Sequence, residues 1–147
     1  MLGINPYISF KGNCEEAINF YKDRLGAEVL FSQTYGDSPM SDQVSEENKG
    51  KIMHTSIKIG DSVIMACDNV FAENPTTVGN NISLAIGGYD IGTAENMFNK
   101  LSDGGTVTMP MQETFWAQRF GMLTDKFGIN WMFNIEKPQE DHAKATA

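Results

Sequence analysis

The chain repeats one pattern of secondary-structure signals in its two halves, and this repeat limits the folds that it can adopt. Alternating apolar and polar residues occupy 5–10 and 81–86, and a helix-start signal follows each run. Three more strand-like runs come after each expected helix, at 27–35, 52–59 and 62–67 in the first half and at 106–111, 120–125 and 129–135 in the second. Each half therefore predicts a strand, a helix and three strands (βαβββ), which favours the α+β class.

The two expected helices carry similar start and stop signals. Asn13 followed by Glu16 is typical of a capping box, and Gly26 ends the first helix. Asp90 is expected to cap the second helix, which ends before Gly104. Apolar residues recur at helical spacing between these signals. The sequence therefore predicts that the two halves are structural copies of each other.

Length and composition are those of one folded domain. The chain has 147 residues, of which 41% are hydrophobic and 20% charged, so it can bury a continuous core. We expect a single domain over 1–136, made of modules at about 4–68 and 80–136. The polar segment 36–50 is expected to be a lid or a disordered excursion. Residues 137–147 are expected to form a flexible tail.

Charge and segment composition exclude some partners. The chain has 19 acidic and 11 basic residues, and its net charge of -8 repels nucleic acid and anionic lipid. No signal peptide or membrane span is evident, so a cytoplasmic protein without a membrane partner is expected. Cys14 and Cys67 match neither a metal-binding nor a disulfide spacing, which predicts two reduced thiols.

Three segments of the chain resemble a known family: PYISFKGNCEEAINFY, HTSIKIGDSVIMACD and QETFWAQRFGMLTDKFGINWMFNI. They are similar to the PhnB-like branch of the glyoxalase/bleomycin resistance protein/dihydroxybiphenyl dioxygenase (vicinal oxygen chelate) superfamily. The resemblance spans 4–136 and implies tandem βαβββ modules whose sheets curl around a cavity, in a homodimer. Some members of this branch are labelled demethylubiquinone methyltransferases. The sequence lacks the Gly-rich turn and acidic ribose ligand that a Rossmann-type nucleotide site needs.

The resemblance also implies where a metal ion would bind. Enzymes of this superfamily hold a divalent ion through His and Glu side chains on the opening and closing strands of each module. The corresponding positions in this chain are Asn5 or Pro6, Asn81, Met132 and Ile64. Amides and apolar side chains hold such an ion poorly. The sequence therefore predicts no metal at this place, and no cofactor.

Strand alternation predicts which side chains face the cavity. In 54–59 the apolar set is Thr55, Ile57 and Ile59, which leaves His54 and Ser56 on the cavity side. The same parity and the repeat place six further residues on that side: Tyr7, Ser9, Ser83, Asn130, Met132 and Asn134.

Four more residues complete the expected ligand site, each with a structural alternative. Trp116 and Phe120 could wall a pocket for a flat or cationic ligand, or pack in the core. Asp68 could add charge at the cavity rim or act as a cap. Glu113 could be a base or cation anchor, or accept backbone hydrogen bonds in a turn. His54 is the best candidate for acid–base chemistry, and a hydrogen-bonded structural histidine is its alternative.

These residues support three hypotheses about function. The first is a metal-independent protein that sequesters or carries an apolar or aromatic small molecule in the cavity. The second is a lyase, isomerase or transferase in which His54 and Glu113 act as acid and base, or serve with Asp68 as relocated metal ligands. In the third, methionine and aromatic side chains fill the cavity and the fold serves for assembly.

Overall fold

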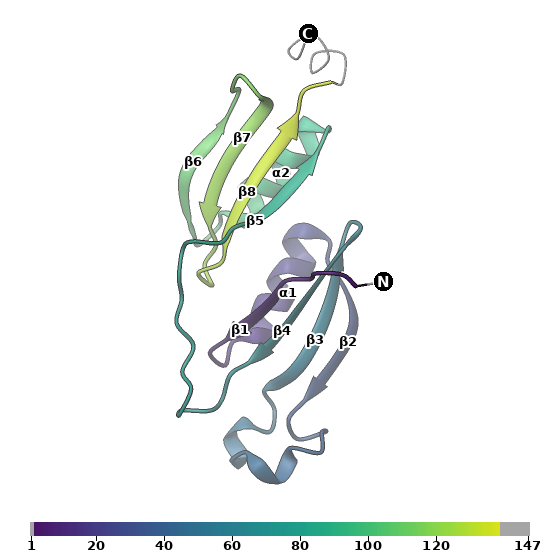
Figure 1. Ribbon diagram of the computed structural model, residues 1–147, viewed down its shortest axis with the longest axis vertical. Helices are drawn as coiled ribbons and strands as arrows, with labels where there is room; N and C mark the ends of the chain where they lie inside the picture. Colours follow the sequence, from purple (N-terminus) through teal and green to yellow (C-terminus); the bar gives the residue numbers. More distant parts are fainter. Residues whose placement is uncertain (1, 139–147) are drawn as a thin grey trace. The chain divides into compact units, whose positions relative to one another are not determined.

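A computed structural model of the chain describes residues 2–138, which form two compact units that divide between Thr77 and Val78. Each unit has one four-stranded mixed sheet and one α-helix (Figure 1), so the predicted α+β class and tandem modules are confirmed. The two sheets are separate. Most of the expected tail, including His142, lies outside the described residues. None of the helices within 2–138 is long and apolar enough to cross a membrane.

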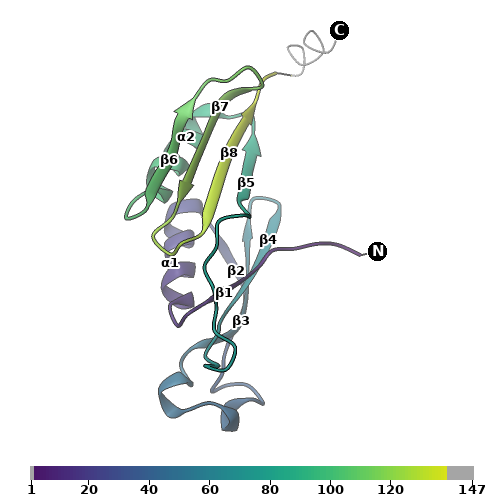
Figure 2. The same ribbon diagram turned by 60° about the vertical axis from the view of Figure 1, so that its left-hand side comes forward.

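The first unit has the sheet order β1-β4-β3-β2, in which β1 runs parallel to β4 and the other pairs are antiparallel. The α1 helix lies against one face of this sheet (Figure 2), and its apolar stripe, including Ala17, Tyr21 and Leu25, is buried there. The elements are β1 (Tyr7–Phe10), α1 (Cys14–Leu25), β2 (Glu28–Thr34), β3 (Ile52–Ile59) and β4 (Ser62–Asp68). We call the sheet face that lies away from α1 the helix-free face of unit 1.

The second unit repeats this topology with the order β5-β8-β7-β6. Its core forms where Phe98 of the helix meets Phe133 of the sheet, with ring centroids 5.3 Å apart in an edge-on arrangement. The elements are β5 (Leu84–Gly88), α2 (Ile91–Leu101), β6 (Thr106–Gln112), β7 (Ala117–Thr124) and β8 (Asn130–Glu136). The sheet face away from α2 is the helix-free face of unit 2.

The opening strand of the second unit begins later than the sequence predicts. A strand over 81–86 was expected, whereas pairing with β8 begins at Leu84, opposite Trp131. Asn130 explains the difference, because its amide nitrogen donates to the carbonyl oxygens of Gly79 (3.1 Å) and Ile82 (3.4 Å). This side chain holds the preceding segment in place, so 81–83 do not join the sheet.

The start of α1 is stabilised by a distant carboxylate rather than by the predicted capping box. The side chain of Asn13 makes no capping hydrogen bond. Instead, Asp68 Oδ1 accepts from the backbone nitrogens of Gly12 and Cys14, both at 2.9 Å. Asp68 Oδ2 accepts from the backbone nitrogen of Ile52, also at 2.9 Å. This side chain, only 1% exposed, joins the end of β4 to the starts of α1 and β3.

A second buried carboxylate shapes the turn between β7 and β8. Asp125 Oδ1 accepts from the backbone nitrogens of Phe127 (2.9 Å) and Ile129 (3.0 Å), and its Oδ2 accepts from the Trp131 indole nitrogen at 2.9 Å. Gly128 follows with a φ of 87°, a conformation that favours glycine.

The acidic loop between β2 and β3 of unit 1 contains two 3₁₀ helices, at Ser41–Gln43 and Glu46–Asn48, so a disordered excursion is not observed.

We expect the substitution Asp68→Asn to destabilise the protein by about 2 kcal/mol or more, because an amide nitrogen would face a buried backbone donor. Asp61→Asn is the matched control, since Asp61 lies exposed in the turn between β3 and β4. Urea unfolding followed by circular dichroism measures both. Equal midpoints for the two variants would show that the Asp68 contacts do not hold unit 1 together.

Candidate functional site

The helix-free face of unit 1 gathers four of the residues that strand parity selected. Tyr7, Ser9, His54 and Ser56 all lie on it, while the alternate residues, such as Ile57, are buried toward α1. The strand register forms rows across the sheet. One row is Tyr7, Met65, Ser56 and Phe31, and the neighbouring strand pairs are Ser9 with Cys67 and His54 with Gln33.

Two aromatic rings approach His54 on this face. The Tyr7 hydroxyl lies 3.0 Å from His54 Nδ1, and the two ring centroids are 5.5 Å apart. The Phe31 ring centroid lies 6.0 Å from that of the imidazole. Burial, followed by the charge and hydrogen bonding of Cys67, raises the pKa of Tyr7 to about 12. The hydroxyl therefore keeps its proton at neutral pH and can donate it to Nδ1.

The helix-free face of unit 2 carries an aromatic cluster beside methionines. The indole nitrogen of Trp116 donates to Asn134 Oδ1 at 3.1 Å. Its ring packs edge-on against Phe120, at 5.2 Å between centroids, and against Phe115, at 4.8 Å. Trp116 is 43% exposed, so it lies at the surface rather than in the core. Met132 pairs with Met122 in the next row of this sheet.

The remaining predicted site residues lie elsewhere. Asp68 points into the α1 side of its sheet and acts as a cap. Ser83 precedes β5, and Asn130 holds the segment before that strand. Glu113 is exposed between β6 and β7 of unit 2, whereas His54 belongs to unit 1. Neither unit by itself contains both residues of the expected acid–base pair, and their pairing stays a prediction.

The positions at which the resemblance implies metal ligands do not fit a divalent ion. Ile64 is buried on the α1 side of its sheet, so its expected equivalence to Met132, on a helix-free face, is wrong. Asn5 and Asn81 precede the strands that were expected to hold them. Within residues 2–138, no three His, Cys, Asp or Glu side chains gather in a group that could hold a metal.

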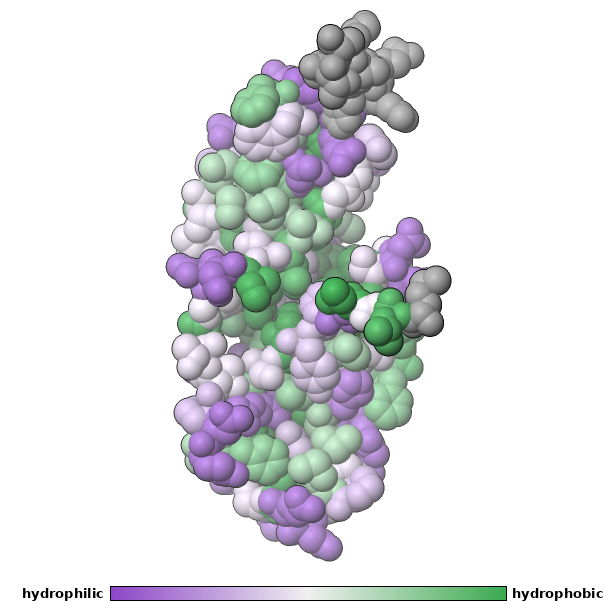
Figure 3. Space-filling model, viewed as in Figure 1, coloured by the Kyte–Doolittle hydropathy of each residue, from purple (hydrophilic) through white to green (hydrophobic). Residues whose placement is uncertain are grey.

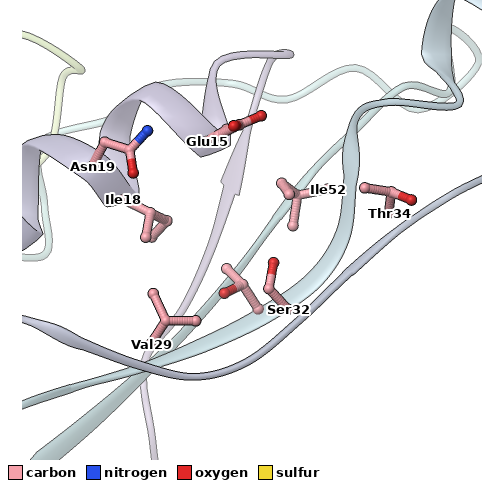
Figure 4. A pocket seen from close by; sticks show the side chains of 8 residues that line it. Glu15, Ile18, Asn19, Val29, Ser32, Thr34 and Ile52 are labelled. Atoms are coloured by element: carbon pink, nitrogen blue, oxygen red, sulfur yellow. The ribbon is translucent and has the colours of Figure 1, made fainter. Parts of the chain in front are cut away.

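A pocket of about 300 Å³ lies on the opposite face of the unit 1 sheet, between α1 and the β2 edge (Figure 4). None of the residues that line this pocket was expected from the sequence to contact a ligand. A register shift between Val29 and Phe31 distorts β2 there. The polar residues Ser32 and Thr34 on this edge are the sequence feature that could have predicted the pocket. The lining residues are Glu15, Ile18, Asn19, Val29, Ser32, Thr34, Ile52 and Thr55.

Comparison of the sequence with known proteins shows the family to which the chain belongs. A sequence model of the glyoxalase/bleomycin resistance protein/dioxygenase superfamily matches residues 3–133. The chain belongs to this superfamily. A curated relative, Protein YjdN of Escherichia coli (strain K12), is 37% identical over 144 residues, which cover 92% of this chain and 97% of YjdN. The resemblance inferred from the sequence is thereby confirmed for nearly the whole chain.

Solved structures of other proteins share the superfamily fold. The crystal structure of PA1353 from Pseudomonas aeruginosa is 39% identical, with a TM-score of 0.83 over 94% of this chain and 100% of that one. The PhnB protein from Bacillus cereus is 24% identical, with a TM-score of 0.75 over 91% of this chain and 99% of that one. At 24% identity, the likeness to the PhnB protein shows a common fold.

We expect the two tryptophans to differ sharply in solvent access. Trp116 is 43% exposed and Trp131 is 2% exposed, so acrylamide should quench the fluorescence of Trp116 several-fold more strongly. The variants Trp131→Phe and Trp116→Phe each retain one tryptophan, so each reports on one side chain. Similar Stern–Volmer constants for the two variants would contradict the exposed position of the Trp116 cluster.

Proposed function

We propose that the chain binds a small apolar or aromatic molecule, without a metal ion, on the helix-free faces of its sheets. The observation that carries this proposal is the gathering of exposed aromatic rings on those faces. Tyr7 is 48% exposed, Phe31 is 50% exposed, and Trp116 lies in a comparable position on the second unit. Groups that can form hydrogen bonds accompany the rings on both faces.

Clustered aromatic rings on an exposed sheet face are an indication of function in a folded protein. A sheet face directed at water ordinarily carries polar side chains, and clustered apolar side chains at a surface mark a binding site. Seen from the side of Figure 1, the surface of unit 1 mixes apolar and polar side chains (Figure 3). Such a surface can take up a flat molecule by stacking, while polar groups at its edge orient it.

His54 is the group best placed to orient a ligand on unit 1. Its Nδ1 atom is engaged by Tyr7, so a ligand would hydrogen-bond to Nε2. The neighbouring Phe31 ring would provide the apolar contact. On unit 2, Asn134 holds Trp116 in position and so prepares an aromatic surface in advance of binding.

N-phenylsuccinimide, which combines an aromatic ring with two carbonyl acceptors, is a suitable probe. At about 100 times its Kd, a ligand stabilises the native state by about 2.7 kcal/mol, which raises Tm by roughly 5 °C or more. We expect this rise in a thermal-shift experiment, unchanged by EDTA or Mn²⁺. A Tm that depends on EDTA or Mn²⁺, or that does not respond to the probe, would contradict the proposal.

Two variants on one strand locate the binding. Phe31→Ala should weaken binding of N-phenylsuccinimide roughly threefold to tenfold, because it removes an aromatic contact. Val29→Ala is the matched control, since Val29 lies on the same strand but lines the pocket beside α1. Isothermal titration calorimetry measures both. A loss of affinity only in Val29→Ala would place the ligand in that pocket instead.

A further inference from the structure

A nucleophilic side chain lies on the helix-free face of unit 1, next to the pair formed by Tyr7 and His54. Cys67 belongs to β4, which lies between β1 and β3 in the sheet, and its thiol is free and only partly buried. Cys14, the other cysteine of the chain, is fully buried against the opposite face. The two thiols therefore differ in their access to a ligand.

Hydrogen-bonding groups connect Cys67 to an imidazole. The Tyr7 hydroxyl lies 3.0 Å from His54 Nδ1. Cys67 lies on the strand between β1 and β3, where it pairs with Ser9, and together with burial it raises the pKa of Tyr7. On the other side, Ser9 Oγ lies 3.8 Å from Cys67 Sγ. Tyr7 is thus near both a thiol and an imidazole on one sheet face, and this proximity is what the transfer of a proton from one to the other needs.

We infer that Cys67 acts as a nucleophile that captures an α,β-unsaturated carbonyl compound bound on the helix-free face of unit 1, with Tyr7 and His54 as positioning residues for proton transfer. This inference rests on the proposed function, because the aromatic rings of the same face must first hold the compound. It adds the chemical class of the ligand, a soft electrophile that carries an apolar or aromatic group.

The step balances without an oxidant, a reductant or a leaving group. The thiol proton passes to the Tyr7 oxygen while the Tyr7 proton passes to His54 Nδ1, which leaves a thiolate and an imidazolium. The thiolate forms a bond to the β-carbon of the compound, and the electron pair of the C=C bond moves toward the carbonyl to give an enolate. The enolate takes up the proton from the imidazolium by way of Tyr7, and the product is a neutral thioether.

The surroundings of Cys67 explain why it needs this assistance. A free thiol is only slightly ionised at neutral pH, so a neighbouring base increases the fraction that reacts. Burial raises the pKa of the other thiol, Cys14, well above its usual range, and so holds it in the unreactive form. Three titratable groups have a pKa that burial and Cys67 raise: Tyr7 from β1, Tyr35 after β2, and Cys14 on the α1 side. His54 on β3 and the adjacent Asp68 are the other titratable groups around this thiol.

The test uses the full chain and N-phenylmaleimide, with intact-mass spectrometry to follow the adduct. We expect one adduct, at Cys67, which Cys67→Ser abolishes and Cys14→Ser leaves unchanged. Tyr7→Phe should slow the reaction about tenfold at pH 7, since it breaks the path to the imidazole. Tyr89→Phe is the matched control, because Tyr89 lies exposed on unit 2. Circular dichroism confirms that each variant is folded.

The pH profile separates proton transfer from a purely structural effect. Imidazole accepts a proton only when it is neutral, so the wild-type rate should rise with pH as the imidazole loses its proton. His54→Gln should lose this rise and keep only the rise at alkaline pH, where the thiol ionises by itself. Rates and pH profiles that are the same in wild type, Tyr7→Phe and His54→Gln would overturn the inference.

N-phenylsuccinimide, the saturated analogue that cannot react with a thiol, distinguishes the two claims. If it slows the reaction while the Tyr7 and His54 variants react normally, the face binds the compound and the inferred role of Cys67 is wrong. If it fails to slow the reaction of wild type at any concentration, the face does not bind the compound, and both claims are overturned. Inhibition together with slow Tyr7→Phe and His54→Gln variants supports both.

Discussion

The structure of the first unit depends on one buried carboxylate. Asp68 accepts hydrogen bonds from three backbone nitrogens at the starts of α1 and β3, so it determines which face of the sheet the helix covers. Side chains alternate along a strand, and Asp68 points toward α1. The preceding residue, Cys67, therefore points to the helix-free face. The same contact that stabilises the fold therefore also places a thiol beside Tyr7 and His54.

The superfamily fold is retained in this chain, whereas no group of His, Cys, Asp or Glu side chains within 2–138 could hold a metal ion. Met132 stands where the resemblance implies a side chain that binds metal, whereas Ile64, expected as its counterpart, lies on the α1 side of its sheet. Aromatic and sulfur-containing side chains occupy the helix-free faces instead, including Phe31 and Met65 on one unit and Trp116 on the other. These polarisable side chains are the basis on which we propose binding of an organic molecule.

Local patterns in the sequence predict most of the fold and part of the candidate site. The repeat predicts both modules, and strand parity separates the helix-free side, with Tyr7, His54 and Asn134, from the helix side because alternation is a local property of a strand. Contacts between distant segments escape such patterns. Asn13 and Glu16 have the spacing of a capping box, yet the carboxylate of Asp68, far along the chain, takes the capping position.

Other features of the structure depend on three-dimensional contacts that the spacing of residues in the sequence does not predict. The later start of β5 follows from the bonds that Asn130 makes across the unit, and the pocket beside α1 follows from an irregular edge strand. The role inferred for Cys67 depends on which neighbours the sheet register brings to it. A cysteine without a recognisable spacing gives no such signal in the sequence, whereas its row in the sheet does.

Nuclear magnetic resonance of ¹⁵N-labelled protein titrated with N-phenylsuccinimide would show directly whether the helix-free face of unit 1 binds a small molecule. We expect the largest changes in amide chemical shift on β1, β3 and β4, around Tyr7, His54 and Cys67. Changes concentrated instead around Glu15, Val29 and Thr34, beside the α1 pocket, would contradict the proposed binding on this face.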